Sequence, residues 1–109
     1  MSELSVKEIV YGHEHAFLPE KAVGVDAVIQ YHLTGEESGD YFITIRDGKC
    51  TAQEGIAQAA RLTFSADGKE FRDILLGKID GMMAFMQGKV KLTGDLNLAM
   101  KYTSLFKLK

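Results

Sequence analysis

FMQGKVKLTGDLNLAMKYTSLF, residues 85–106 of this 109-residue chain, is the most informative part of the sequence. Residues 89–93 alternate polar and apolar side chains, with Val90 and Leu92 on one face, which is typical of a half-buried strand. Gly94 ends this strand, and Asp95 can cap the helix that follows, because its carboxylate accepts hydrogen bonds from free backbone N–H groups. The stretch therefore predicts a strand followed directly by a helix.

The predicted helix after Asp95 is apolar around more than half of its circumference. At about 100° per residue the apolar arc covers roughly 220°. Its members are Leu96, Leu98, Ala99, Met100, Tyr102, Leu105 and Phe106. A helix of this kind needs two apolar neighbours. The sheet is one, and the second is another protein element, a partner chain or a bound apolar ligand.

Length and composition indicate one globular domain over residues 1–109, with 46% hydrophobic and 26% charged residues. A net charge of −2 predicts neither nucleic-acid binding nor strong attraction to an anionic membrane. We expect no stable membrane insertion, because no apolar run is long enough for a spanning helix. A cytoplasmic location is expected, since the N-terminus lacks a secretion signal, the C-terminus lacks a peroxisomal signal, and Cys50 is the lone cysteine.

The rest of the sequence predicts an α+β order of helix, four strands, two helices, strand and helix. A helix is expected over residues 5–17 and strands over residues 24–34, 41–46, 49–53 and 61–65, with Asp47-Gly48 as a hairpin turn. Asp67 and Glu70 have the spacing of a capping box, and the helix that they begin stops at Gly77. A second short helix runs from Asp80 to Gly88.

Four of the five methionines lie in the last 28 residues of the chain, at positions 82, 83, 86 and 100. Methionine is unbranched and polarizable, so a wall built from it can repack around ligands of different shape. Apolar residues at helical spacing more often form an ordinary core. Composition alone leaves both interpretations open.

The sequence resembles the sterol carrier protein type-2 family, also called nonspecific lipid-transfer proteins, over about residues 18–106. The resemblance rests on Phe85, residues 87–89, 94–95 and 98–101, and Leu105-Phe106, with upstream similarity in residues 19–22, 25–30, 33–36 and 47–50. It implies an α+β fold in which helices cover a five-stranded, mostly antiparallel sheet, with an apolar tunnel between them. It also implies broad, non-catalytic binding and transfer of fatty acids, fatty acyl-CoA or sterols, with no cofactor.

The resemblance and the helix faces together give a candidate ligand-binding set. Matching positions assign Phe85, Leu92, Leu98, Met100, Leu105 and Phe106 to the tunnel. Helix-face geometry adds Phe71, Ile74, Leu75, Met82, Met83, Met86 and Leu96. Gln87 is either a contact for a ligand headgroup or a solvent-facing helix terminus.

Two other classes of function compete with lipid binding. An enzyme would draw on His13, Glu14, His15, His32 or Cys50, but His13 and His15 face apart on a helix, and the histidines are expected at the surface without a metal. An interaction module would instead cover the last helix with another chain. It would be a homodimer, or an accessory subunit that presents apolar substrates to a separate enzyme. For the lipid carrier we expect a monomer or weak homodimer that binds an apolar small molecule.

Overall fold

The computed structural model describes residues 5–107 and has the element order that the sequence predicts. The elements are α1 (Val6–Ala16), β1 (Ala27–Thr34), β2 (Gly39–Arg46), β3 (Lys49–Glu54), β4 (Leu62–Asp67), α2 (Gly68–Leu75), α3 (Gly81–Met86), β5 (Val90–Gly94) and α4 (Leu96–Tyr102). Two short 3₁₀ helices, η1 (Pro19–Lys21) and η2 (Thr103–Leu105), were not predicted. The strand expected from residue 24 begins only at Ala27, because Gly24 adopts a positive φ of 80°.

The five strands form one mixed sheet in the order β3-β2-β1-β4-β5. β1 pairs in parallel with β4, and every other neighbouring pair is antiparallel, which confirms the expected mostly antiparallel sheet. Asp47 and Gly48 both have positive φ, at 54° and 72°, and connect β2 to β3 in the predicted tight hairpin.

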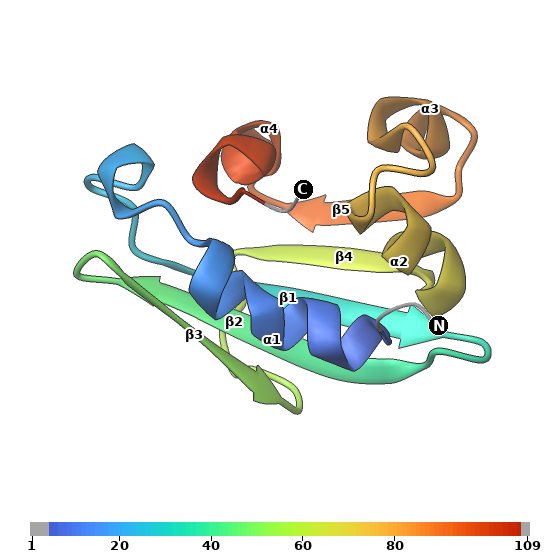
Figure 1. Ribbon diagram of the computed structural model, residues 1–109, viewed down its shortest axis with the longest axis horizontal. Helices are drawn as coiled ribbons and strands as arrows, with labels where there is room; N and C mark the ends of the chain where they lie inside the picture. The colour runs from blue at the N-terminus through green and yellow to red at the C-terminus, as the bar shows by residue number, and fades with distance from the viewer. Residues whose placement is uncertain (1–4, 108–109) are drawn as a thin grey trace.

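The helices cover one face of this sheet (Figure 1). α1 packs against β2 and β3, α2 against β4 and β1, and α4 against β4 and β5. The core side chains of the central strands alternate toward the helices, so Ile29 and Tyr31 of β1 and Ile43 of β2 are fully buried. Within residues 5–107, none of the helices has the length and apolar character needed to cross a bilayer.

Carboxylates and a serine hydroxyl begin the helices. Ser5 and Glu8 form a reciprocal capping box at α1, and Asp67 accepts a hydrogen bond from the Glu70 backbone N–H at α2. Asp80 and Asp95 accept backbone hydrogen bonds in the same way at α3 and α4, and the sequence predicts the cap at Asp95. These caps fix where each helix begins relative to the sheet, and so they fix which side chains the helices turn toward it.

Candidate functional site

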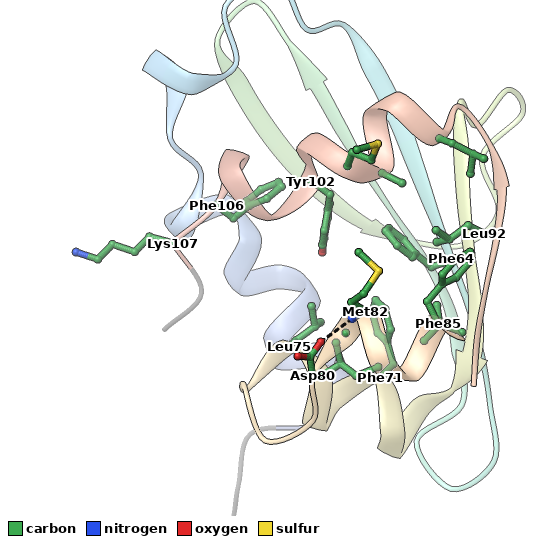
Figure 2. Close-up of a pocket in the computed structure, with 16 residues that line it drawn as sticks. Phe64, Phe71, Leu75, Asp80, Met82, Phe85, Leu92, Tyr102, Phe106 and Lys107 are labelled. Carbon is green, nitrogen blue, oxygen red and sulfur yellow. Dashed lines mark hydrogen bonds between the residues drawn. The ribbon is translucent and has the colours of Figure 1, made fainter. Parts of the chain in front are cut away.

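A cavity of about 950 Å³ lies between the β4–β5 end of the sheet and helices α2, α3 and α4 (Figure 2). Its walls are almost entirely apolar. The described residues that line it are Phe64, Phe71, Ile74, Leu75, Asp80, Gly81, Met82, Phe85, Val90, Leu92, Leu96, Ala99, Met100, Tyr102, Phe106 and Lys107.

The sheet wall of the cavity follows from strand alternation. Phe64 of β4 pairs in register with Leu92 of β5, and Ala66 pairs with Val90 two residues away. Cross-strand partners point to the same face, so Phe64, Leu92 and Val90 all face the helices. The outward-facing Lys91 between them is exposed.

The floor of the cavity is aromatic. Phe71 and Tyr102 are 2% and 4% exposed, and Phe64 packs on both, with ring centroids 5.6 Å and 5.0 Å away respectively. Phe106 closes this cluster, 5.4 Å from the Tyr102 ring. Aromatic rings have few rotatable bonds, so this floor is stiff.

The rim of the cavity is flexible and apolar. Met82 and Phe85 of α3 are 67% and 45% exposed, and Leu96 and Met100 of α4 are 55% and 82% exposed. Large apolar side chains normally lose this exposure on folding. The cavity is therefore open to solvent between α3 and α4, and the methionines at its edge can adjust to an occupant.

Charged groups meet the cavity only at its edge, where Asp80 and Lys107 lie among the described lining residues. Asp80 is engaged as the cap of α3, since its carboxylate accepts hydrogen bonds from the backbone N–H groups of Met82 and Met83 (Figure 2). An apolar wall with so little polar content favours an apolar occupant over a charged one.

A buried chain of polar groups supports the aromatic floor from behind. His13 Nδ1 lies 2.8 Å from the Ile9 carbonyl oxygen, and its Nε2 contacts the Tyr102 hydroxyl. The Tyr102 hydroxyl also lies 2.9 Å from the Tyr31 hydroxyl. The prediction that all histidines lie at the surface is wrong for His13, which is fully buried, whereas His32 is exposed and pairs with Asp40.

Burial controls protonation in this chain of groups. It lowers the pKa of His13, because a charged imidazole would lose its hydration in the core, although the hydrogen bond to Ile9 opposes the shift. Burial likewise raises the pKa values of Tyr31 and Tyr102 above the usual tyrosine range. All three groups are therefore neutral near pH 7.

The structure places nine of the thirteen predicted ligand-binding residues on the cavity wall. They are Phe71, Ile74, Leu75, Met82, Phe85, Leu92, Leu96, Met100 and Phe106. Leu98 and Leu105 are instead buried in the core, and Met83 and Met86 are exposed outside the cavity wall. Gln87 is exposed at the C-terminal end of α3 and is outside the wall as well.

Four apolar members of the wall were missing from the predicted set: Phe64, Val90, Ala99 and Tyr102. Phe64 and Val90 lie on the inward face of their strands, and Tyr102 and Ala99 lie on the apolar arc of α4. Strand alternation and the arc were the signals that could have found them. Whether any of the wall residues binds a ligand stays a prediction.

Among residues 5–107, the three histidines, Glu14 and Cys50, which are the candidate catalytic groups of the sequence, lie outside the cavity wall. Burial raises the pKa of the Cys50 thiol to about 12, so the reactive thiolate is scarce at neutral pH. Within residues 5–107, no cluster of three or more histidine, cysteine, aspartate or glutamate side chains could hold a metal ion.

Comparison with known proteins gives one family and several relatives. Residues 12–107 match the model of the SCP-2 sterol transfer family. Hydroxysteroid dehydrogenase-like protein 2 of Xenopus tropicalis is 39% identical over 75 residues, which cover 68% of this chain and 18% of that protein. The chain spans about a fifth of the length of the first curated relatives that it matches.

Solved structures share the same fold. A double mutant of PisA1, a sec-alkyl sulfatase from Pseudomonas sp., aligns with a TM-score of 0.83 at 25% identity, over 95% of this chain and 16% of the sulfatase. The solution structure of palmitated SCP2L2 from Aedes aegypti aligns with a TM-score of 0.73 at 21% identity, over 95% of this chain and 93% of that one.

Proposed function

This chain belongs to the SCP-2 sterol transfer family, and on that premise we propose that it binds lipids in the cavity between the sheet and helices α2 to α4 and transfers them without catalysing a reaction. The observation that carries the proposal is the cavity itself. Its volume of about 950 Å³ is at the upper end of the usual size of small-molecule sites, and its wall is apolar.

The energetics of such a cavity are sufficient for useful affinity. Each methylene transferred from water to an apolar site gains about 0.8 kcal/mol, so a 16-carbon chain gains roughly 12 kcal/mol before costs. The loss of translational and rotational freedom on binding reduces the net free energy of binding. The remainder corresponds to a micromolar or sub-micromolar dissociation constant. Because so little of the gain depends on directional contacts, we propose broad specificity among fatty acids, fatty acyl-CoA and sterol-like molecules.

The relatives support this proposal in two ways. The Aedes aegypti neighbour was solved in a palmitated form, and it has the same fold. Other relatives are far longer proteins named as a dehydrogenase-like protein and a sulfatase, in which the matching part is a small fraction. That second observation favours an alternative role, in which this chain presents apolar substrates to a separate enzyme as an accessory module.

We further propose that the protein is a monomer or weak homodimer that loads its ligand without a metal or cofactor. A cytoplasmic location remains a prediction from the lone Cys50. A stand-alone carrier and an accessory module differ in one measurable respect. An accessory module transfers ligand faster when its enzyme is present, whereas a stand-alone carrier exchanges ligand between free pools at a rate that the enzyme does not change.

The test is uptake of a fluorescent fatty acid in detergent-free buffer, with native mass spectrometry before and after organic extraction. The protein has no tryptophan, so the probe supplies the signal. We expect saturable binding with a stoichiometry near one. If no adduct survives purification and no probe saturates at high micromolar concentration, the proposal is wrong.

Two variants of exposed methionines locate the site. Met100→Asp places a charge on the cavity wall, and Met86→Asp places the same charge on α3 outside that wall. Both positions are 76% or more exposed, so neither change should unfold the protein. We expect about a tenfold weaker affinity for Met100→Asp, equivalent to about 1.4 kcal/mol, and an unchanged affinity for Met86→Asp. Equal effects of the two variants would place the ligand elsewhere.

A further inference from the structure

A row of polar side chains crosses the face of the sheet that lies opposite the helices (Figure 1). His32 of β1 pairs in register with Asp40 of β2 on one side and with Ser65 of β4 on the other. Ser65 in turn pairs with Lys91 of β5. Side chains alternate along a strand, so these four residues point away from the helices, and the next residue along each strand points toward them. We call this set the polar row.

One hydrogen bond of the polar row is already formed. His32 Nδ1 lies 2.6 Å from Asp40 Oδ1. An ionised carboxylate can only accept, so Nδ1–H donates, and the neutral form of the imidazole keeps Nε2 as an acceptor. The backbone of Asp40 is held in place, because its carbonyl oxygen accepts a hydrogen bond of 2.8 Å from the Gly55 N–H. The His32 side chain is 56% exposed, so a molecule in solution can reach it.

Ser65 is the neighbour of His32 on the side away from Asp40. Neighbouring strands are about 4.8 Å apart, so a short serine side chain at the paired position lies close to the imidazole. Within the described part of the chain, Ser65 and His32 are not hydrogen-bonded to each other. Hydrogen bonds between a nucleophile and its base are often long without a substrate and tighten when one binds.

Lys91 adds a positive charge on the far side of Ser65. Its side chain is exposed, and Ser65 is half-buried between Lys91 and His32. A negative charge that develops on a group attached to Ser65 would lie beside the lysine ammonium group and be stabilised by it. The polar row therefore supplies an oriented base, a hydroxyl nucleophile and a cation in the order that acyl transfer requires.

We propose that the polar row hydrolyses small carboxylic esters through an acyl-serine intermediate. Ser65 Oγ attacks the ester carbonyl carbon, and His32 Nε2 takes the hydroxyl proton. The bond from carbon to the alcohol oxygen then breaks, and His32 returns the proton to that oxygen. Water attacks the acyl-serine by the same route and releases the carboxylic acid. Lys91 stabilises the oxyanion, and Asp40 is a positioning residue that keeps the imidazole proton on Nδ1.

This activity is separate from lipid carriage, because the polar row and the cavity lie on opposite faces of the sheet. The row is open to solvent, so we expect small esters with good leaving groups to react, without selection for a long acyl chain. The sequence indicated His32 as a candidate catalytic group but not Ser65. The two residues are neighbours only through the pairing of β1 with β4, which no local pattern reveals.

The test is hydrolysis of p-nitrophenyl acetate by the whole protein, with the rate for an equal concentration of free imidazole subtracted. We expect an acetyl group that peptide mass spectrometry places on Ser65 in samples quenched early in the reaction. Ser65→Ala and His32→Gln should each lower the rate about tenfold or more. The matched controls Ser38→Ala and His15→Gln change the same residue types at exposed positions outside the row and should leave the rate unchanged.

The positioning role of Asp40 has its own readout. Asp40→Ala removes the acceptor of the Nδ1–H group, so the imidazole proton is no longer held on that nitrogen. We expect a rate about fivefold or more lower than in the parent, and partial recovery in Asp40→Glu, which restores a carboxylate. Nitrogen NMR of the His32 ring should show the proton leaving Nδ1 in Asp40→Ala. A purely structural role of Asp40 would not change that signal.

Any of four results overturns the proposal. The first is the absence of an acetyl group on Ser65, and the second is an equal loss of rate in the row and control variants. The third is a rate that survives Ser65→Ala but falls in His32→Gln, because the imidazole then acts without the serine. The fourth is an Nδ1 proton that stays in place in Asp40→Ala. Far-UV circular dichroism of each variant shows that it is folded.

Uptake of the fluorescent fatty acid is measured on the same variants. Ser65 and His32 are outside the cavity wall, so their variants should load the probe as the parent does while losing hydrolysis. A failure of the ester activity is thereby distinguished from a failure of lipid binding.

Discussion

Replacing Tyr102 by phenylalanine removes one oxygen atom, and we expect a disproportionate loss of stability. The direction of each hydrogen bond explains why. The Ile9 carbonyl can only accept, so His13 Nδ1–H donates to it, and the neutral imidazole leaves Nε2 as an acceptor. The Tyr102 hydroxyl therefore donates to Nε2, and its oxygen accepts from the Tyr31 hydroxyl. Tyr102 is the central member of this chain.

The expected magnitude follows from the groups that the substitution leaves without partners. Tyr102→Phe strands the His13 Nε2 acceptor and the Tyr31 O–H donor, and both residues are fully buried. Each unsatisfied buried group costs about 1–3 kcal/mol, so the two together should lower the free energy of unfolding by about 2–6 kcal/mol. Tyr31→Phe removes only the hydrogen bond that the Tyr102 hydroxyl accepts, and Tyr102 can still donate to His13. This variant should lose about 1 kcal/mol in the free energy of unfolding.

The assay is urea unfolding followed by far-UV circular dichroism. Tyr11→Phe is the matched control, because Tyr11 is 37% exposed, and its free energy of unfolding should stay within about 0.5 kcal/mol of the parent. The expected order of cost is Tyr102→Phe, then Tyr31→Phe, then Tyr11→Phe. A Tyr102→Phe variant as stable as the Tyr11→Phe control would refute the reasoning. A larger cost for Tyr31→Phe than for Tyr102→Phe would contradict the central position of Tyr102 between His13 and Tyr31.

Two further predictions concern acid sensitivity and glycine. Burial lowers the pKa of His13 in the folded protein below the value of about 6.5 that the residue has in the unfolded chain. As the pH falls below about 6.5, the unfolded chain binds this proton more readily than the folded protein does. The free energy of unfolding therefore falls, by at most about 1.4 kcal/mol per pH unit. His13→Gln should flatten that slope in urea titrations between pH 7 and 5. Gly12→Ala should stabilise α1 by about 0.5–1 kcal/mol, since the new Cβ meets nothing within 4 Å. Gly68→Ala should cost about 3 kcal/mol or more, because its Cβ would lie 1.9 Å from the Glu37 carbonyl oxygen, and thermal melts measure both changes.

The order of elements was predictable because its signals are local. Alternation in β1 and β5, the Asp47-Gly48 turn and the aspartate caps each depend on a few neighbouring residues, and the structure confirms them. The burial of His13 depends on Tyr102, which is 89 positions away in the sequence. No local pattern around His13 contains that partner, so the surface interpretation was the reasonable default and was wrong.

The cavity wall was predictable only in part, for a related reason. The apolar arc of α4 predicts two neighbours but does not say which residues face the core and which face the cavity. Leu98 packs into the core, whereas Leu96 is at the rim of the cavity. On α3, Met82 lines the cavity and Met83 does not, and their helical spacing alone does not predict this difference. Alternation puts Phe64 on the inward face of β4, but it does not show that Phe64 borders the cavity, because that also depends on its pairing with Leu92 of β5.

The inner and outer sides of the apolar arc of α4 contribute differently to stability and to function. Tyr102 on the inner side is buried and holds the core together through His13, so a change there is expected to cost folding free energy. Met100 on the outer side is 82% exposed, and the folded protein gains almost nothing from its burial. A polar residue at position 100 should therefore fold equally well while weakening ligand uptake. The proposed occupant of the cavity would account for an apolar side chain at this exposed position of the cavity wall.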